Sequence, residues 1–259
     1  MEILNFIILG IVQGVTEFLP ISSSGHLILA REFLNIQTEF GLTHDAIFQL
    51  ATTLAVCIYF RKDIYELIKS INNGDSNNKK LLSGIIIGTI PAIFFGFILE
   101  GQMDTIFRDV RLVAITMFVG SVIIYFAEII SKQNKELTLK NSFLIGLFQS
   151  LALIPGMSRS GMTISGGLFL GLKRESAIRF SFLLSIPILI GSGLKKTLDL
   201  FSTGANNDFG ILVFVGAIAS FVVGIASIHF LISYLKKNTM MVFVIYRIIV
   251  GIILLVAFL

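Results

Sequence analysis

The stretch PGMSRSGMT, at Pro155–Thr163, decides the fold that we expect for this chain. It interrupts an apolar region, and the apolar runs on its two sides, 143–154 and 162–172, are each too short to cross a bilayer. A helix that crosses the hydrocarbon core needs about 20 apolar residues, with about 17 as the lower limit. Two short runs around a polar break therefore predict a re-entrant hairpin, whose irregular tip is tolerated only where protein or a watery cavity surrounds it.

A second break has the same character. The stretch EFLPISSSGH, at Glu17–His26, separates the short apolar runs 3–16 and 27–34. The rest of the chain contains six apolar runs that are long enough to span a bilayer, at about 43–60, 81–99, 112–131, 177–194, 210–235 and 239–259. We therefore expect an all-α polytopic membrane protein with six transmembrane helices and two re-entrant helical hairpins.

The composition agrees with an integral membrane protein. Of the 259 residues, 55% are hydrophobic and 14% are charged, whereas a soluble domain carries about 25% charged residues. The mean hydropathy is +0.90. A net charge of +4 could suggest nucleic acid, but in a membrane chain the excess bases mark cytoplasmic loops. We expect a membrane-lipid environment and no nucleic-acid partner.

The two breaks also resemble each other in sequence. The matched residues are Gly10 with Gly146, Gln13 with Gln149, Ser24 with Ser160, Gly25 with Gly161, and Gly88 with Gly216. The order of one hairpin and three spans therefore occurs twice. Because three spans end on the opposite side of the membrane from where they begin, the second copy is inverted relative to the first. We predict a single membrane domain, 1–259, built as an inverted-topology repeat with repeat 1 at about 1–131 and repeat 2 at about 142–259.

The charge distribution predicts the orientation. The segments 61–80, 131–142, 173–179 and 236–238, which we expect to be loops, hold most of the Lys and Arg residues. Positively charged loops face the cytoplasm, so both termini lie outside and the two hairpins enter the membrane from opposite sides. Their polar tips then meet within the bilayer.

The second tip has the residues of a phosphate-binding site. Arg159 lies at membrane depth, where an ionisable group indicates function, and its guanidinium fork fits two phosphate oxygens. A helix that starts near Gly161 adds a dipole that favours an anion. Hydroxyl donors come from Ser158, Ser160 and Thr163. The alternative is a structural turn whose Arg reaches an interface.

The first tip has the complementary chemistry. Gln13 and Glu17 are spaced i, i+4 and share one helix face, and Glu17 could bind a hard divalent cation or act as a base. Its alternative role is a structural ion pair with Arg159. His26 suits proton transfer near neutrality, and one serine of Ser22–Ser24 could be a nucleophile if His26 or Glu17 activates it.

Together the two tips suit phosphoryl transfer to water from a substrate with a lipid tail. A transporter or flippase of phosphorylated lipids is the alternative, because inverted repeats with opposed re-entrant tips occur in transporters. The chemical difference between the tips favours catalysis. Arg247, the second cation in an apolar run, has either a structural or a substrate-binding role, and we favour the structural one.

The stretches QGVTEFLPISSSGH, residues 13–26, and PGMSRSGMT resemble the two signature motifs of the bacterial undecaprenyl-diphosphate phosphatases, the bacitracin resistance proteins. The resemblance covers essentially the whole chain. It implies a hydrolase of the bacterial plasma (inner) membrane that converts undecaprenyl diphosphate to undecaprenyl phosphate and phosphate. That reaction recycles the carrier lipid for peptidoglycan synthesis and confers bacitracin resistance. The resemblance also implies a divalent cation, Mg²⁺ or Ca²⁺, and a site that opens outward.

The resemblance also implies roles for individual residues. Glu17 is similar to the family's metal ligand or base, Ser23 and His26 to its serine and essential histidine, and Arg159 to its phosphate-binding arginine. This chain departs from the family at Gln13, where a Glu is common, so an amide oxygen replaces a carboxylate as a metal ligand. The nucleophile (Ser23, His26 or water) and the oligomeric state, for which a homodimer is one candidate, stay open at this point.

Overall fold

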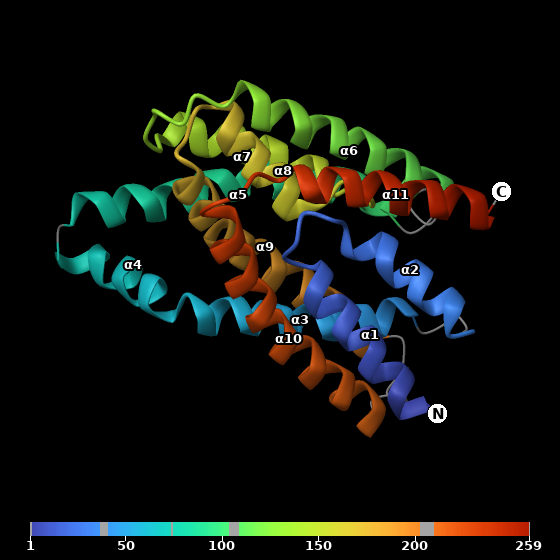
Figure 1. Cartoon of the computed structure of the whole chain (residues 1–259). Helices are drawn as coiled ribbons and strands as arrows, with labels where there is room; N and C mark the ends of the chain where they lie inside the picture. Colours follow the sequence, from blue (N-terminus) through green and yellow to red (C-terminus); the bar gives the residue numbers. More distant parts are fainter. Residues whose placement is uncertain (1, 37–40, 74, 104–108, 203–209, 259) are drawn as a thin grey trace.

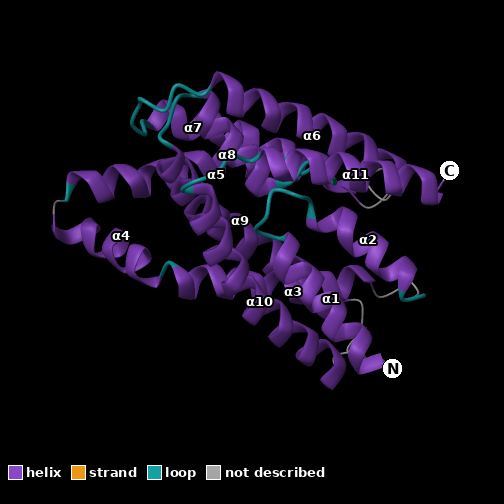
Figure 2. Ribbon diagram, viewed as in Figure 1, coloured by secondary structure: helices purple, strands orange, loops and turns teal. Residues whose placement is uncertain are grey.

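The computed structural model of the chain describes residues 2–36, 41–73, 75–103, 109–202 and 210–258 (Figure 1). Figure 2 shows that these residues form helices and connecting loops. The helices are α1 (Glu2–Thr16), α2 (Ser23–Phe33), α3 (Gly41–Tyr59), α4 (Arg61–Asn73), α5 (Ser76–Met103), α6 (Val110–Ile130), α7 (Leu139–Leu151), α8 (Arg159–Phe169), α9 (Arg174–Ser202), α10 (Ile211–Leu235) and α11 (Met241–Phe258).

Five of the described helices are long and apolar enough to cross a membrane, namely α5, α6, α9, α10 and α11. They lie at the runs predicted for 81–99, 112–131, 177–194, 210–235 and 239–259, and the chain is a multi-pass membrane protein. The helix α3 occupies the sixth predicted run, 43–60, but is not among the five. It carries His44, Asp45 and Gln49 among its apolar residues, so its place as a span stays a prediction.

The prediction of a loop at 61–80 is wrong, because α4 occupies Arg61–Asn73 and α5 begins soon after it. The segment has many charges, but its apolar residues recur at the spacing of one helix face. Leu67 is buried, Ile64 packs against the core, and Ile68 is exposed. Helical periodicity within a charged segment therefore sets the local structure.

Each short helix pair forms a hairpin that is held by a long helix. The helix α1 packs against α10 and α7 packs against α5. A Cβ atom at Gly10 would collide with the carbonyl oxygen of Gly216, and one at Gly146 would collide with that of Gly88. The close approach therefore needs glycine on the hairpin helix in both cases. These four residues are among those that the sequence matches between its two halves.

The two hairpin tips lie inside the packed core of the molecule. Phe18 from the first tip and Met162 from the second are fully buried and belong to the largest hydrophobic cluster. The ring centroids of Phe18 and Phe182 are 5.8 Å apart, so α9 covers the first tip. Irregular backbone in a membrane protein needs surrounding protein or a watery cavity, and these contacts show that protein surrounds both tips.

Candidate active site

Glu17 is the centre of the contacts between the two tips. The Arg159 guanidinium donates to its Oε1 at 2.9 Å, and the Ser23 hydroxyl donates to its Oε2 at 3.1 Å. The Gln13 amide also donates to Oε2, at 3.0 Å. The side chain of Glu17 is 5% exposed, so these bonds replace the water that a carboxylate otherwise needs. One carboxylate therefore links a cation from the second tip to a hydroxyl from the first.

The two tips position these groups by the same backbone geometry. Ser22 has φ 75° and Ser158 has φ 70°, a left-handed region that non-glycine residues rarely adopt. Each serine caps the next helix, since its Oγ accepts from the N–H of Gly25 or Gly161, respectively. The first residue of α2 is thus Ser23 and the first residue of α8 is Arg159. Strained residues of this kind cluster at functional sites.

Two hydrogen bonds to the backbone join the tips in addition to the Arg159–Glu17 pair. The backbone N–H of Gly156 donates to Ser24 Oγ at 3.3 Å, and Ser160 Oγ donates to the carbonyl oxygen of Leu19 at 3.2 Å. Ser24 and Ser160 hold matched positions in the two halves, and each bonds to the backbone of the opposite tip. The prediction that the polar tips meet is therefore confirmed.

Arg247 of α11 forms hydrogen bonds with the backbone of both tips. It is fully buried, and it donates to the carbonyl oxygens of Pro20 in the first tip and Gly156 in the second, at 3.3 and 2.9 Å. Its other acceptors are Met117 O and Ser121 Oγ, each at 3.1 Å. All four are neutral oxygens, and in the described part of the chain no carboxylate lies within ion-pair distance of Arg247. This arrangement favours the structural role.

His26 lies beside the site with both ring nitrogens occupied. Its Nδ1 is 2.7 Å from the carbonyl oxygen of Ser22, and its Nε2 is 2.8 Å from the hydroxyl of Tyr246. A carbonyl can only accept, so Nδ1 carries a proton and a neutral ring accepts at Nε2. The two rings are nearly parallel, at 5.5 Å between centroids. Sequence reasoning did not single out Tyr246, whose one distinguishing feature in the sequence is its position next to Arg247.

The other predicted substrate-binding residues have partners near the start of α8. Ser158 Oγ accepts from the Gly161 N–H at 3.3 Å. Thr163 Oγ1 donates to the Arg159 carbonyl at 2.8 Å and also contacts Ser181 Oγ. These contacts fix the geometry around Arg159. A direct contact of these residues with substrate stays a prediction.

The oxygen atoms around Glu17 set what kind of metal ion could bind. The described residues contain no group of three or more His, Cys, Asp and Glu side chains that could hold an ion. Glu17, the Gln13 amide oxygen and Ser23 are hard oxygen donors with a single negative charge among them. This set fits an ion that takes most of its ligands from water and substrate phosphate, as Mg²⁺ does.

The chain is similar to proteins of one bacterial family. The family model described as Bacitracin resistance protein BacA matches residues 6–253. A relative from Alteromonas mediterranea, named undecaprenyl-diphosphatase, is 43% identical, and the alignment covers 98% of each chain. A relative of the same name from Thermobifida fusca is 42% identical, and the alignment covers 98% of this chain and 90% of the relative. Another, from Moorella thermoacetica, is 38% identical, and the alignment covers 100% of this chain and 98% of the relative.

Proposed function

Because the chain belongs to the bacitracin resistance protein BacA family, we propose that its site hydrolyses undecaprenyl diphosphate to undecaprenyl phosphate and phosphate. The observation that carries this proposal is the bonding of Arg159 and Ser23 to the two oxygens of Glu17. It places a phosphate-binding cation and a hydroxyl around one carboxylate inside a multi-pass membrane protein. The reaction returns the carrier lipid to peptidoglycan synthesis and removes the diphosphate form, which accounts for bacitracin resistance.

Substrate binding exchanges partners at Arg159. Its guanidinium is paired with Glu17 in the structure, and the terminal phosphate of the substrate offers the same bidentate acceptor geometry. When Arg159 turns to the phosphate, Glu17 keeps its bond to Ser23. The backbone at the start of α8 adds the positive end of a helix dipole. The apolar helices around the tips accommodate the prenyl chain.

Ser23 is the nucleophile that the contacts favour. Its hydroxyl already donates to Glu17 Oε2, so Glu17 takes the proton as Ser23 Oγ attacks the terminal phosphorus. The bond from that phosphorus to the bridging oxygen breaks, and undecaprenyl phosphate leaves. Glu17 passes this proton to the departing undecaprenyl phosphate. Water then attacks the phosphoserine, and Glu17 accepts the water's proton and returns it to the Ser23 oxygen as phosphate leaves. His26 is a weaker candidate because both of its nitrogens are engaged.

A divalent cation, Mg²⁺ or Ca²⁺, is part of the proposal. Glu17 and Gln13 would hold it, and when bound it would neutralise charge on the diphosphate. Gln13 would contribute its amide oxygen after rotation of the side chain, since its amide nitrogen now faces Glu17. The chain itself supplies the remaining positive charge through Arg159.

The finer architecture is also proposed. We infer that α3 is the sixth span, that the two hairpins are re-entrant, and that the halves form an inverted repeat. The matched contacts of Gly10 with Gly216 and of Gly146 with Gly88 support this arrangement. By the positive-inside rule, the site then faces outward from the bacterial inner membrane. A homodimer is compatible with the exposed apolar faces of the spans.

Hydrolysis by the purified protein tests the function. Arg159→Ala and Glu17→Ala should each lower kcat/KM for a polyprenyl diphosphate by at least about 100-fold, the effect of losing one electrostatic contact to a transition state. Lys236→Ala, an exposed charge removal after α10, is the matched control and should leave the rate unchanged. Near-wild-type rates in both site variants would overturn the proposal.

The transporter alternative makes a different prediction in liposomes. A flippase would move a non-hydrolysable phosphorylated prenyl lipid between leaflets, whereas the enzyme releases phosphate without that movement. The opposed tips support the transporter alternative, because such tips occur in transporters built from inverted repeats. Vectorial movement of the lipid without phosphate release would replace the hydrolase proposal.

A further inference from the structure

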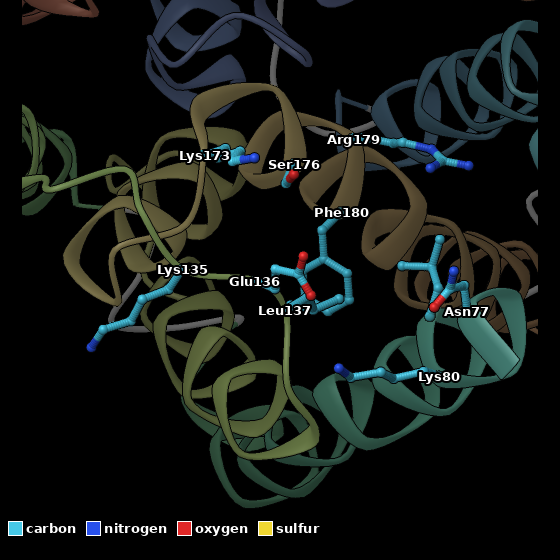
Figure 3. A pocket seen from close by; sticks show the side chains of 10 residues that line it. Asn77, Lys80, Lys135, Glu136, Leu137, Lys173, Ser176, Arg179 and Phe180 are labelled. Carbon is cyan, nitrogen blue, oxygen red and sulfur yellow. The ribbon is translucent and has the colours of Figure 1, made fainter.

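A cavity lies away from the tips, where α5, α7 and α9 begin (Figure 3). Its volume is about 410 Å³, within the range of small-molecule sites. The lining residues come from the first turns of α5 and α9 and from the segment between α6 and α7. We propose that this cavity binds a phosphate group, on a membrane lipid or as the free ion. The proposal does not depend on the hydrolase reaction.

The charge of the lining favours an anion. Four cations, Lys80, Lys135, Lys173 and Arg179, line the cavity with one carboxylate, Glu136. Figure 3 shows Lys80 and Lys173 on opposite sides of the cavity with Glu136 between them. Among the described residues neither of these two lysines makes an ion pair, so their charges are available. Lysine ammonium groups bind phosphate as point charges.

Arg179 anchors the rim, and the helix ends add to the positive field. Arg179 pairs with Asp63 of α4 through its Nε at 2.6 Å and a terminal nitrogen at 2.5 Å, which anchors the rim and balances its charge. The helices α5, α7 and α9 all begin around this cavity, so their partial positive charges point toward it. The N-terminal groups of α5 are already bonded to Asp75, so the lysines carry the argument and the dipoles reinforce it.

The rim of the cavity is held in place without a ligand. The backbone N–H of Lys135 donates to the Gly171 carbonyl at 2.9 Å, which fixes the segment between α6 and α7 against the end of α8. Arg174, the first residue of α9, makes two hydrogen bonds to Glu128 of α6 at 2.6 and 2.7 Å. A preformed site loses less conformational freedom when a ligand binds.

The lining also indicates the kind of molecule that carries the phosphate. Ser176 and Asn77 provide neutral donors, while Leu81, Leu137 and Phe180 form an apolar part. A charged rim beside an apolar wall at the end of a helix bundle is typical of a lipid-headgroup site. The cavity lies at the base of the α7–α8 hairpin. Because α7 has 13 residues, the cavity is about 20 Å from the catalytic tip.

Native mass spectrometry of the full-length protein in detergent can measure this binding. The Arg159→Ala variant serves as the background, so that phosphate held at the tips does not contribute. The probes are short-chain phosphatidic acid, inorganic phosphate and, as a neutral-headgroup control, short-chain phosphatidylcholine. Phosphatidic acid should bind with the highest affinity of the three.

Charge changes in the lining should alter the affinity in both directions. Lys80→Gln with Lys173→Gln should weaken phosphatidic acid binding about 30-fold, given roughly 1 kcal/mol for each lysine near a lipid phosphate. Lys236→Gln with Lys237→Gln removes the same charge from exposed sites outside the cavity and should change binding less than twofold. Glu136→Gln should tighten binding about fivefold.

The outcomes distinguish a lipid headgroup from free phosphate as the ligand, and they test whether the cavity is the binding site. If phosphatidic acid and inorganic phosphate both bind and both depend on Lys80 and Lys173, the phosphate group alone is the ligand. If only phosphatidic acid binds in that way, the ligand is a lipid headgroup. The proposal is overturned if neither probe binds, if phosphatidylcholine binds equally well, or if both double variants weaken binding to the same extent. None of these results depends on hydrolysis.

Discussion

The tip between α1 and α2 and the tip between α7 and α8 start their second helices in the same way but carry different side chains. Ser22 and Ser158 both have a positive φ and both cap the helix that follows. The next residue is Ser23 in one tip and Arg159 in the other, and each bonds to a different oxygen of Glu17. One backbone design therefore delivers a hydroxyl and a cation to the same carboxylate.

The helices that lead into the tips differ in a second way. Gln13 of α1 donates to Glu17, whereas the matched Gln149 of α7 is buried and neither of its amide atoms has a partner among the described residues. The second half has no acid at the position of Glu17, where it carries Leu153. The first hairpin thus carries the carboxylate and the imidazole, and the second carries the guanidinium.

The largest loss of activity should come from removing the hydroxyl of Ser23 that contacts Glu17. Ser23→Ala should lower kcat by at least about 1,000-fold, since loss of a nucleophile removes the covalent route. Ser24→Ala, the neighbouring serine that bonds to Gly156 instead, should lose about tenfold or less. Rapid-mix assays of phosphate release give both values. Equal losses in the two variants would contradict the assignment of Ser23.

A somewhat smaller effect should follow from separating the tips. Arg247→Met leaves the carbonyls of Pro20 and Gly156 without their shared donor, so we expect kcat/KM to fall about 100-fold, by about 3 kcal/mol of lost positioning. Arg247→Lys keeps one donor group and should recover part of the rate. Hydrolysis and melting temperature should be measured on each variant. A folded Met variant with full activity would show that the tips stay together without this residue.

The sequence predicted much of this site because its strongest signals are local. Run lengths around Pro155 and Pro20 identify the hairpins, and the placement of Glu17 and Arg159 at polar tips brings them together once the hairpins oppose each other. The contact of His26 with Tyr246 joins residues 220 positions apart, and no local pattern encodes it. The helix α4 was not predicted because its charges favour a loop, whereas packing of Leu67 decides its structure.

The smallest expected effect concerns the unpartnered amide. Gln149→Met should raise the free energy of unfolding by about 1 kcal/mol and leave kcat unchanged, because it removes a buried polar group that has no partner among the described residues. Gln13→Met removes a bond to Glu17 and should lower stability by a similar amount. Thermal unfolding in detergent measures both changes. A loss of stability in Gln149→Met would mean that the amide has a role that its present contacts do not provide.

The central claim is that the two tips form one site through Glu17. A double-mutant cycle tests it most directly, with kcat/KM measured for Ser23→Ala, Arg159→Ala and the double variant on the same polyprenyl diphosphate. Groups that act in one step are strongly non-additive, so the double variant should lose little more than the worse single variant. Losses that multiply, as they do for independent sites, would contradict the account.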